Sequence, residues 1–264
     1  MDNNLNQNNQ IENNGVAYNS TLSNQSVQIN QSNLDGGTNT SKKNSSLIVF
    51  GIVLIIAIVL VITLFIENKN NNSITSSLIN ENTKTLIVYF SKDGENYGKN
   101  LNIENKRILT EGNTKVMARK ISTFIKADLY EIKPLIAYPE DLNELYARTK
   151  IEYNQNIYPE IENKITNLDS YDVIFIGYPI WHASFPQIIK TFVRDNKEIL
   201  KNKIIVPFNT HAGSGSAGTY KKLFNLIGIP DNRGLNGLSI NGTEVENSEE
   251  NIVNWLKGIG YNVK

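Results

Sequence analysis

The chain has 264 residues, and its 26 Lys and Arg side chains balance its 26 Asp and Glu side chains, so its formal charge is zero. A chain without a basic excess is not expected to take nucleic acid as its main partner. The absence of cysteine excludes disulfides, thiolate catalysis and cysteine-bound zinc or iron–sulfur sites, and two histidines are too few for a His-rich metal centre. We therefore expect no metal site.

Residues 1–45 are rich in Asn, Gln, Ser and Thr and contain only scattered aliphatic side chains. Such a segment buries too little apolar surface to offset the conformational entropy that folding removes. The composition predicts a disordered tail, which is either a solvated leader or an interaction arm.

An uncharged apolar run extends from Leu47 to Ile66 and is interrupted only by Gly51 and Thr63. A helix of this length, at about 1.5 Å per residue, matches a hydrocarbon core of roughly 30 Å. A signal peptide is the alternative, but its apolar region is typically only about 7 to 15 residues long, and no small-residue cleavage site follows this run. We predict a transmembrane helix over residues 46–66.

The lysines beside the apolar run indicate its orientation. Lys42 and Lys43 lie just before it, whereas Lys69 follows it close to an acidic residue. The positive-inside rule then places the N-terminus in the cytoplasm and the rest of the chain on the extracytoplasmic side. Residues 67–83, rich in Asn and Ser, are expected to form a flexible linker to a folded domain over residues 84–264.

Strand and helix patterns alternate five times in the folded domain. The first, third and fourth strands are continuous apolar runs typical of buried parallel strands, whereas the second has the polar neighbours of an edge strand. This alternation predicts an α/β fold with a five-stranded parallel sheet in the order 2-1-3-4-5 and helices on both faces. The expected strands cover residues 85–90, 128–133, 172–176, 203–208 and 234–240, and the expected helices cover residues 114–126, 138–158, 186–198, 219–227 and 248 onward.

Three loops are expected to form the ligand site. In a sheet of this order, ligands bind beyond the carboxyl ends of the strands, where the winding direction reverses. The loops over residues 91–114, 177–184 and 209–218 all leave the carboxyl ends of adjacent strands. We therefore expect them to converge on one place.

The first loop has the features of an anion site. The hydroxyls of Ser91, Thr110 and Thr114 and the amide of Asn113 lie between the first strand and the first helix. The first turn of a helix offers N–H groups without partners and the positive end of the macrodipole, and both favour a phosphate. The alternative is that Asn113 or Thr114 merely caps the helix.

The second and third loops suit a flat ring system. Trp181, beside the rigid Pro179, either stacks on a planar heterocycle or packs under the helix that follows. Gly213, Gly215 and Gly218 let the backbone of the third loop approach a ligand closely, although a flexible Ser/Gly connector has the same composition.

Four segments together resemble the flavodoxin family, specifically its flavodoxin-like branch with a Gly-Tyr-Pro-Ile-Trp loop. They are Ile-Val-Tyr-Phe-Ser from residue 87, Glu-Gly-Asn-Thr from residue 111, Asp-Val-Ile-Phe-Ile-Gly-Tyr-Pro-Ile-Trp from residue 172, and Val-Pro-Phe-Asn-Thr-His-Ala-Gly-Ser from residue 206. The resemblance covers essentially residues 84–264. It implies a flavodoxin-like fold that holds FMN without a covalent bond.

The resemblance also implies which residues contact FMN, with the first loop at the phosphate and the other two loops on either side of the isoalloxazine ring. Residues 92–109 are an insertion relative to compact flavodoxins, and Tyr97 within it is expected to cover the flavin. The cofactor-binding residues expected on this basis are Ser91, Gly112, Asn113, Thr114, Tyr178, Pro179, Ile180, Trp181, His182, Thr210, His211, Gly213 and Ser214.

The resemblance implies an FMN protein that acts in electron transfer with an unidentified redox partner protein or small acceptor, and the apolar run adds a membrane anchor. The cofactor carries the redox chemistry, so no catalytic side chain is expected. Lys and Arg slightly outnumber Asp and Glu in the domain, so acidic steering toward a basic partner is not evident. The alternatives are an FMN-dependent NAD(P)H:quinone-type reductase and a flavin-free binding module on the same fold.

Other enzyme classes fit the sequence poorly. The segment from Ser214 to Gly218 lacks the first glycine of a nucleophile elbow, and both histidines precede Ser216, against the residue order of α/β-hydrolases. A dinucleotide-binding domain is excluded because no Gly-x-Gly-x-x-Gly follows the first strand. A P-loop nucleotidase is excluded because the sequence contains no Gly-x-x-x-x-Gly-Lys-Ser/Thr motif.

Overall fold

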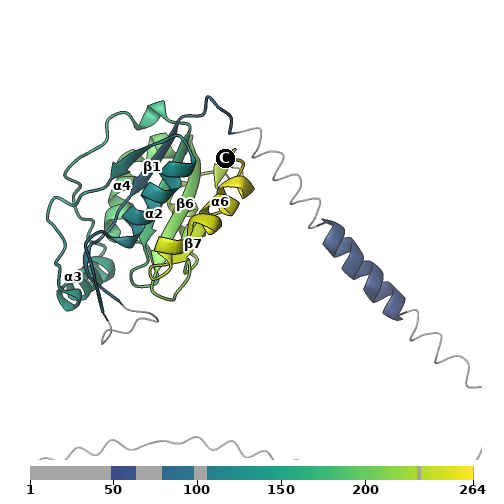
Figure 1. The fold of residues 1–264 in the computed structure, drawn as a ribbon, viewed down its shortest axis with the longest axis horizontal. Coiled ribbons are helices and arrows are strands. Elements are labelled where there is room, and N and C mark those ends of the chain that lie inside the picture. Colours follow the sequence, from purple (N-terminus) through teal and green to yellow (C-terminus); the bar gives the residue numbers. More distant parts are fainter. Residues whose placement is uncertain (1–48, 64–78, 98–105, 231–232, 264) are drawn as a thin grey trace, which may run out of the picture. The chain divides into compact units, whose positions relative to one another are not determined.

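The computed structural model describes residues 49–63, 79–97, 106–230 and 233–263 (Figure 1). The tail predicted for residues 1–45 lies outside the described residues, as does most of the predicted linker. Of that linker, residues 79–83 are described, and Ile79 is buried in the core of the domain. The folded part of the chain therefore includes residues before Lys84.

Residues 49–63 form a helix whose apolar side chains are exposed. The run predicted to span a membrane begins two residues earlier and ends three residues later, outside the described part of the chain. Within the described ranges, no helix combines the length and the apolar character that crossing a membrane requires.

The domain is built on a five-stranded parallel sheet with the order β4-β1-β5-β6-β7. If the five strands of this sheet are numbered 1 to 5 in chain order, without β2 and β3, their order is 2-1-3-4-5, as predicted. The strands are β1 (Thr85–Tyr89), β4 (Ala127–Glu131), β5 (Val173–Pro179), β6 (Ile204–His211) and β7 (Leu238–Asn241).

The structure differs from the prediction in a second, two-stranded sheet. It pairs β2 (Gly94–Asn96) antiparallel with β3 (Arg107–Leu109), and both strands fall in the insertion between β1 and the first helix of the domain. Strands of three residues are too short to show the alternation by which a strand is recognised in a sequence.

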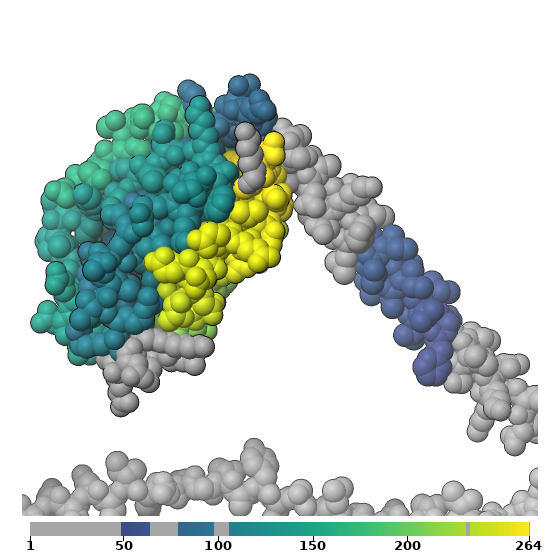
Figure 2. All heavy atoms as spheres, in the orientation of Figure 1, coloured from purple at the N-terminus to yellow at the C-terminus, as the bar shows by residue number. Residues whose placement is uncertain are grey.

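Five α-helices cover the two faces of the sheet among the described residues of the domain. Successive residues of β1 point to opposite faces, so Leu86 and Val88 belong to one core cluster and Ile87 and Tyr89 to the other. Helices α2 and α6 lie side by side on one face (Figures 1 and 2), and α3, α4 and α5 pack on the other. The helices are α2 (Asn113–Phe124), α3 (Leu142–Gln155), α4 (Gln187–Leu200), α5 (Thr219–Ile227) and α6 (Glu249–Gly258).

Strands β5 and β6 continue further than the sequence predicts. Gly177, Tyr178 and Pro179 were expected in a loop, but parallel pairing with β6 keeps them in the strand, with Tyr178 opposite Asn209. The Tyr178 side chain consequently points into the core, where it is fully buried and its hydroxyl donates to Thr219 Oγ1 at 3.1 Å. In this strand, pairing with β6 overrides the turn-forming tendency of Gly177 and Pro179.

The start of α2 is capped by a side chain that is remote in the sequence. Its N-cap residue, Gly112, has no side chain to accept a hydrogen bond, and Ser91 at the end of β1 supplies the acceptor. The Lys115 N–H is shared between Ser91 Oγ and Gly112 O, both at 3.0 Å. This contact fixes the first turn of α2 against the carboxyl end of β1.

We expect Ser91→Ala to lower the free energy of unfolding by about 0.5 to 1 kcal/mol, because the helix loses a side-chain acceptor at its first turn. Urea unfolding followed by circular dichroism measures the change. Ser122→Ala is the matched control, since that hydroxyl donates to Arg119 O within the same helix, and its effect should stay within about 0.5 kcal/mol. Equal effects of the two substitutions would contradict the capping role of Ser91.

Candidate functional site

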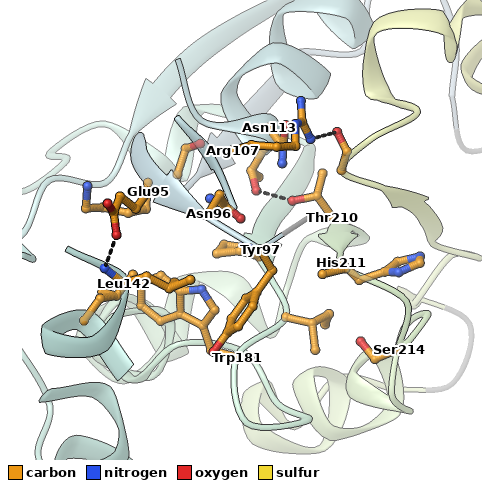
Figure 3. Close-up of a pocket in the computed structure, with 18 of the residues that line it drawn as sticks. Glu95, Asn96, Tyr97, Arg107, Asn113, Leu142, Trp181, Thr210, His211 and Ser214 are labelled. Carbon is orange, nitrogen blue, oxygen red and sulfur yellow. Dashed lines mark hydrogen bonds between the residues drawn. The ribbon is translucent and has the colours of Figure 1, made fainter. Parts of the chain in front are cut away.

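A cavity of about 600 Å³ lies at the carboxyl ends of β1, β5 and β6. All three loops that the sequence predicts to converge contribute to its lining (Figure 3). Asn113, Arg107 and Thr210 lie toward one end of the view, and Trp181 and Leu142 lie toward the other. The two ends differ in chemistry.

The first end is the N-terminus of α2. Thr114 Oγ1 and Thr210 Oγ1 lie 2.8 Å apart and are buried, so they join the first turn of α2 to the end of β6. Within the described ranges, no acceptor is found for the backbone N–H of Asn113 or Thr114. Unpaired N–H groups at the positive end of a helix dipole form a site for an anion.

Gly112 allows the first turn of α2 to lie against the segment that follows β1. A Cβ atom at this position would lie 2.3 Å from Ser91 Oγ and 2.5 Å from Lys92 O, which is closer than atoms can approach. The absence of a side chain therefore brings the backbone of the helix start against the end of β1.

A second close approach involves Gly242 and Asn113. A Cβ atom at Gly242, in the loop after β7, would lie 2.3 Å from Asn113 Nδ2. Gly242 N donates to His211 O at 2.8 Å, and Gly242 O accepts from Arg107 Nη1 at 3.0 Å. The inserted hairpin, the end of β6 and the loop after β7 thus meet near Asn113.

The second end is aromatic and is built on a tight turn after β5. Trp181 and Ser184 exchange two backbone hydrogen bonds of 2.9 Å, and the two residues between them, His182 and Ala183, both have positive φ (49° and 51°). Two successive residues with positive φ are the pattern of a type I′ hairpin turn, in which neither residue is normally bulky. The turn presents the Trp181 ring to the cavity.

Two aromatic rings pack against Trp181. Phe90 and Tyr138 each meet it edge to face, with ring centroids 5.4 and 5.3 Å from that of the tryptophan. Tyr138 in turn donates its hydroxyl to Glu152 Oε2 at 2.9 Å, and Glu152 Oε1 accepts from Arg148 Nε at 2.9 Å. Burial, reinforced by the Glu152 charge, raises the pKa of the Tyr138 phenol, which therefore stays a hydrogen-bond donor.

His182 ties the same turn to α3. Its Nε2 lies 2.9 Å from Thr149 Oγ1, and its ring centroid lies 5.0 Å from that of Tyr146. Burial lowers the pKa of His182, and the charge of Lys150 lowers it further, so the imidazole is neutral at pH 7. His182 therefore forms part of the cavity wall as an uncharged side chain.

The third loop closes the cavity beside His211. His211 Nδ1 accepts from Gly213 N at 3.0 Å, so the neutral ring carries its proton on Nε2. Gly213 has a φ of 131°, which side chains disfavour. Burial lowers the pKa of His211, against a smaller raising effect of Glu244.

Ten of the thirteen residues expected to bind the cofactor line this one cavity. The other three do not line it: Gly112 and Gly213 shape the turns beside it, and Tyr178 is buried in the core beneath it. The ten lining residues are Ser91, Asn113, Thr114, Pro179, Ile180, Trp181, His182, Thr210, His211 and Ser214.

Several lining residues were not expected from the sequence, although Tyr97 was expected to cover a ligand. Ala183 and Ala212 belong to the predicted second and third loops, and the others come from the inserted segment, from α3, and from the end of β7 with the loop after it. The last group follows the same rule as the predicted loops, because β7 is also a parallel strand that ends at this edge. These additional residues are Lys92, Glu95, Asn96, Arg107, Leu142, Leu145, Tyr146, Thr149, Ala183, Ala212, Asn241, Gly242 and Thr243.

The comparisons with known structures agree with this architecture. A protein from Bacteroides eggerthii DSM 20697, assigned as a flavoprotein, is 31% identical and matches 69% of this chain and 100% of its own with a TM-score of 0.53. A second such protein, from Bacteroides uniformis ATCC 8492, is 27% identical and matches 66% of this chain and 98% of its own with a TM-score of 0.50.

A flavoprotein from Lactobacillus acidophilus NCFM, whose structure was determined in complex with FMN, is 27% identical. It matches 62% of this chain and 97% of its own, with a TM-score of 0.45. Among curated proteins, no significant match to this chain is found. The model of the flavodoxin family matches residues 107–259, which is more than half of the chain. The chain therefore belongs to the flavodoxin family.

Proposed function

We propose that this protein binds FMN non-covalently in the cavity and acts in electron transfer at a membrane. The observation that carries the proposal is that an anion-binding helix start and a tryptophan-bearing turn line the same cavity. Membership of the flavodoxin family and the FMN complex of the Lactobacillus flavoprotein support the choice of cofactor.

The residues at the first end of the cavity fit a phosphate. The N–H groups of Asn113 and Thr114 and the hydroxyls of Ser91, Thr114 and Thr210 surround the helix start. A phosphate monoester carries roughly two negative charges at neutral pH, and it suits donors at the positive end of a helix.

The residues at the second end fit a flat ring. Trp181 offers an indole that Phe90 and Tyr138 fix in place, and an aromatic partner gains about 0.5 to 1.5 kcal/mol from such contacts beyond its burial. Tyr97 from the hairpin lines the same cavity. Bound FMN supplies the redox chemistry, while these residues orient its ring and exclude water.

A reductase is the second candidate function, and the wall formed by α3 favours it. Leu142, Leu145 and Tyr146 extend the cavity lining beyond Trp181 with apolar surface that suits a planar organic acceptor. Rapid-mixing reduction by NADPH, compared with a stepwise titration with dithionite, separates the two functions. Fast reduction by NADPH favours a reductase, and a one-electron stage without such reduction favours a carrier.

The FMN proposal predicts that the full-length protein in mild detergent forms a yellow complex with FMN, seen as a shifted visible spectrum. Trp181→Ala should raise the dissociation constant about 10-fold, because a stacked ring loses its partner and part of its burial. The chain offers a matched control in Trp255→Phe, since Trp255 packs against Phe175 in the other core cluster. Absence of any complex would instead favour a flavin-free binding module.

We further propose that the apolar run over residues 47–66 anchors the protein in a membrane, with the N-terminus in the cytoplasm. The described part of this run, residues 49–63, is helical and has its apolar side chains exposed, and such a surface needs cover. Extended over the full run of twenty residues, a helix reaches roughly 30 Å, which is the thickness of the hydrocarbon core.

The anchor proposal predicts that the full-length protein resists extraction from membranes by alkaline carbonate. Ile55→Lys combined with Ile56→Lys should release it, because each charge near the middle of a span costs about 2.5 to 3.5 kcal/mol. Leu135→Lys with Ile136→Lys is the control, since both side chains are exposed on the domain. Protease added to intact cells should digest the domain, because the domain is proposed to lie outside the cytoplasm. A domain protected from the protease would indicate the opposite orientation. A wild-type protein extracted by carbonate would refute the anchor.

A further inference from the structure

Arg107 is a cation at the anion-binding end of the cavity that the family resemblance did not suggest. It lies in β3 of the inserted hairpin, opposite Asn96 of β2, and its half-buried side chain lines the cavity. One nitrogen of its guanidinium group, Nη1, donates to Gly242 O at 3.0 Å. The hairpin thus carries a positive charge across to the loop after β7.

The position of Gly242 brings this guanidinium to the first turn of α2. Asn113 Nδ2 packs directly against the Gly242 Cα, as the 2.3 Å distance to a hypothetical Cβ shows. Arg107 and Asn113 therefore contact the same residue, and they lie together at one end of the cavity in Figure 3. The cation is held beside the N–H groups that suit a phosphate.

Arg107 differs from three lysines of the same part of the chain, because each of those lysines forms an ion pair with a carboxylate. Lys92 pairs with Asp93, Lys106 pairs with Glu95, and Lys115 pairs with Glu131. Across the described ranges, no carboxylate lies within ion-pair distance of Arg107. An arginine has five N–H donors in a planar fork, so the bond to Gly242 leaves donors for an anion.

We propose that Arg107 binds the phosphate of FMN and sets the preference of this protein for FMN over riboflavin. The inference rests on the proposed function, because it assigns a residue to the cofactor placed there. The donors at the start of α2 are neutral, whereas the phosphate is a dianion. A guanidinium fixed beside these donors compensates the negative charge of the phosphate, which neutral hydroxyls and amides do not. Riboflavin has no phosphate, so its binding does not benefit from the guanidinium.

The test titrates the full-length apoprotein in mild detergent with FMN and with riboflavin and follows the flavin fluorescence. In Arg107→Gln we expect the dissociation constant for FMN to rise about 10-fold or more, as the loss of a charge-assisted hydrogen bond implies. The constant for riboflavin should stay within about 2-fold, in the range of substitutions that remove no contact. Arg107→Lys, which keeps the charge but loses the fork, should fall between wild type and Arg107→Gln.

Lys106→Gln is the matched control. It removes one positive charge from the next position in the hairpin, but Lys106 pairs with Glu95 and does not line the cavity. The FMN-to-riboflavin preference of Lys106→Gln should equal that of the wild type. Thermal unfolding of each apoprotein checks that the variants are folded.

Two results would overturn the inference. If Arg107→Gln weakens FMN and riboflavin equally, the residue acts by holding the Gly242 loop and not through the phosphate. If it changes neither constant, the guanidinium takes no part in binding. In both cases the wild type still binds FMN, whereas a wild type that binds neither flavin would refute the proposed function itself.

Discussion

The close approach of two backbone turns determines where the site can form. Gly112 lies against Ser91 and the Lys92 carbonyl at distances that exclude any side chain, and Ser91 accepts a hydrogen bond from the first turn of α2. These contacts fix the start of α2 at the carboxyl end of β1, one strand away from β5 and its tryptophan-bearing turn. The start of α2 and the Trp181 ring consequently line one cavity.

The inserted hairpin is held at both ends of that cavity. At the aromatic end, Glu95 Oε2 accepts from Leu142 N at 3.1 Å and so supplements Asp141, the N-cap residue of α3. At the polar end, Arg107 donates to Gly242 O. An insertion anchored to α3 and to the loop after β7 forms part of the cavity wall, so residues that distinguish this chain from compact flavodoxins line the same cavity as the predicted loops.

The sequence predicts those parts of the fold that depend on long-range burial. Strands β1, β5 and β6 are continuous apolar runs covered on both faces, and their order follows from which strand has polar neighbours. The hairpin escapes such reasoning, because Gly94–Asn96 and Arg107–Leu109 are short and become strands only by pairing with each other. Arg107 therefore could not be placed at the site, since its position depends on a pairing across the insertion.

Tyr178 illustrates the same limit within the predicted loops. Its neighbours, Gly177 and Pro179, are turn-forming residue types, yet pairing with β6 extends the strand through all three. The strand alternation then sends the Tyr178 side chain into the core, whereas Trp181 lies beyond the end of the strand and reaches the cavity. A shift of a few residues in a strand end decides which aromatic side chain lines the cavity.

The turn that carries Trp181 stores strain for which the surrounding contacts compensate. His182 and Ala183 both have positive φ, and such residues cost roughly 1 to 3 kcal/mol each where glycine is absent. The paired bonds between Trp181 and Ser184, together with the contact of His182 with Thr149, oppose that cost. These contacts, together with the edge-to-face rings of Phe90 and Tyr138, orient the indole through the protein alone. A flat ring that binds against an indole fixed in this way requires little further ordering of the protein.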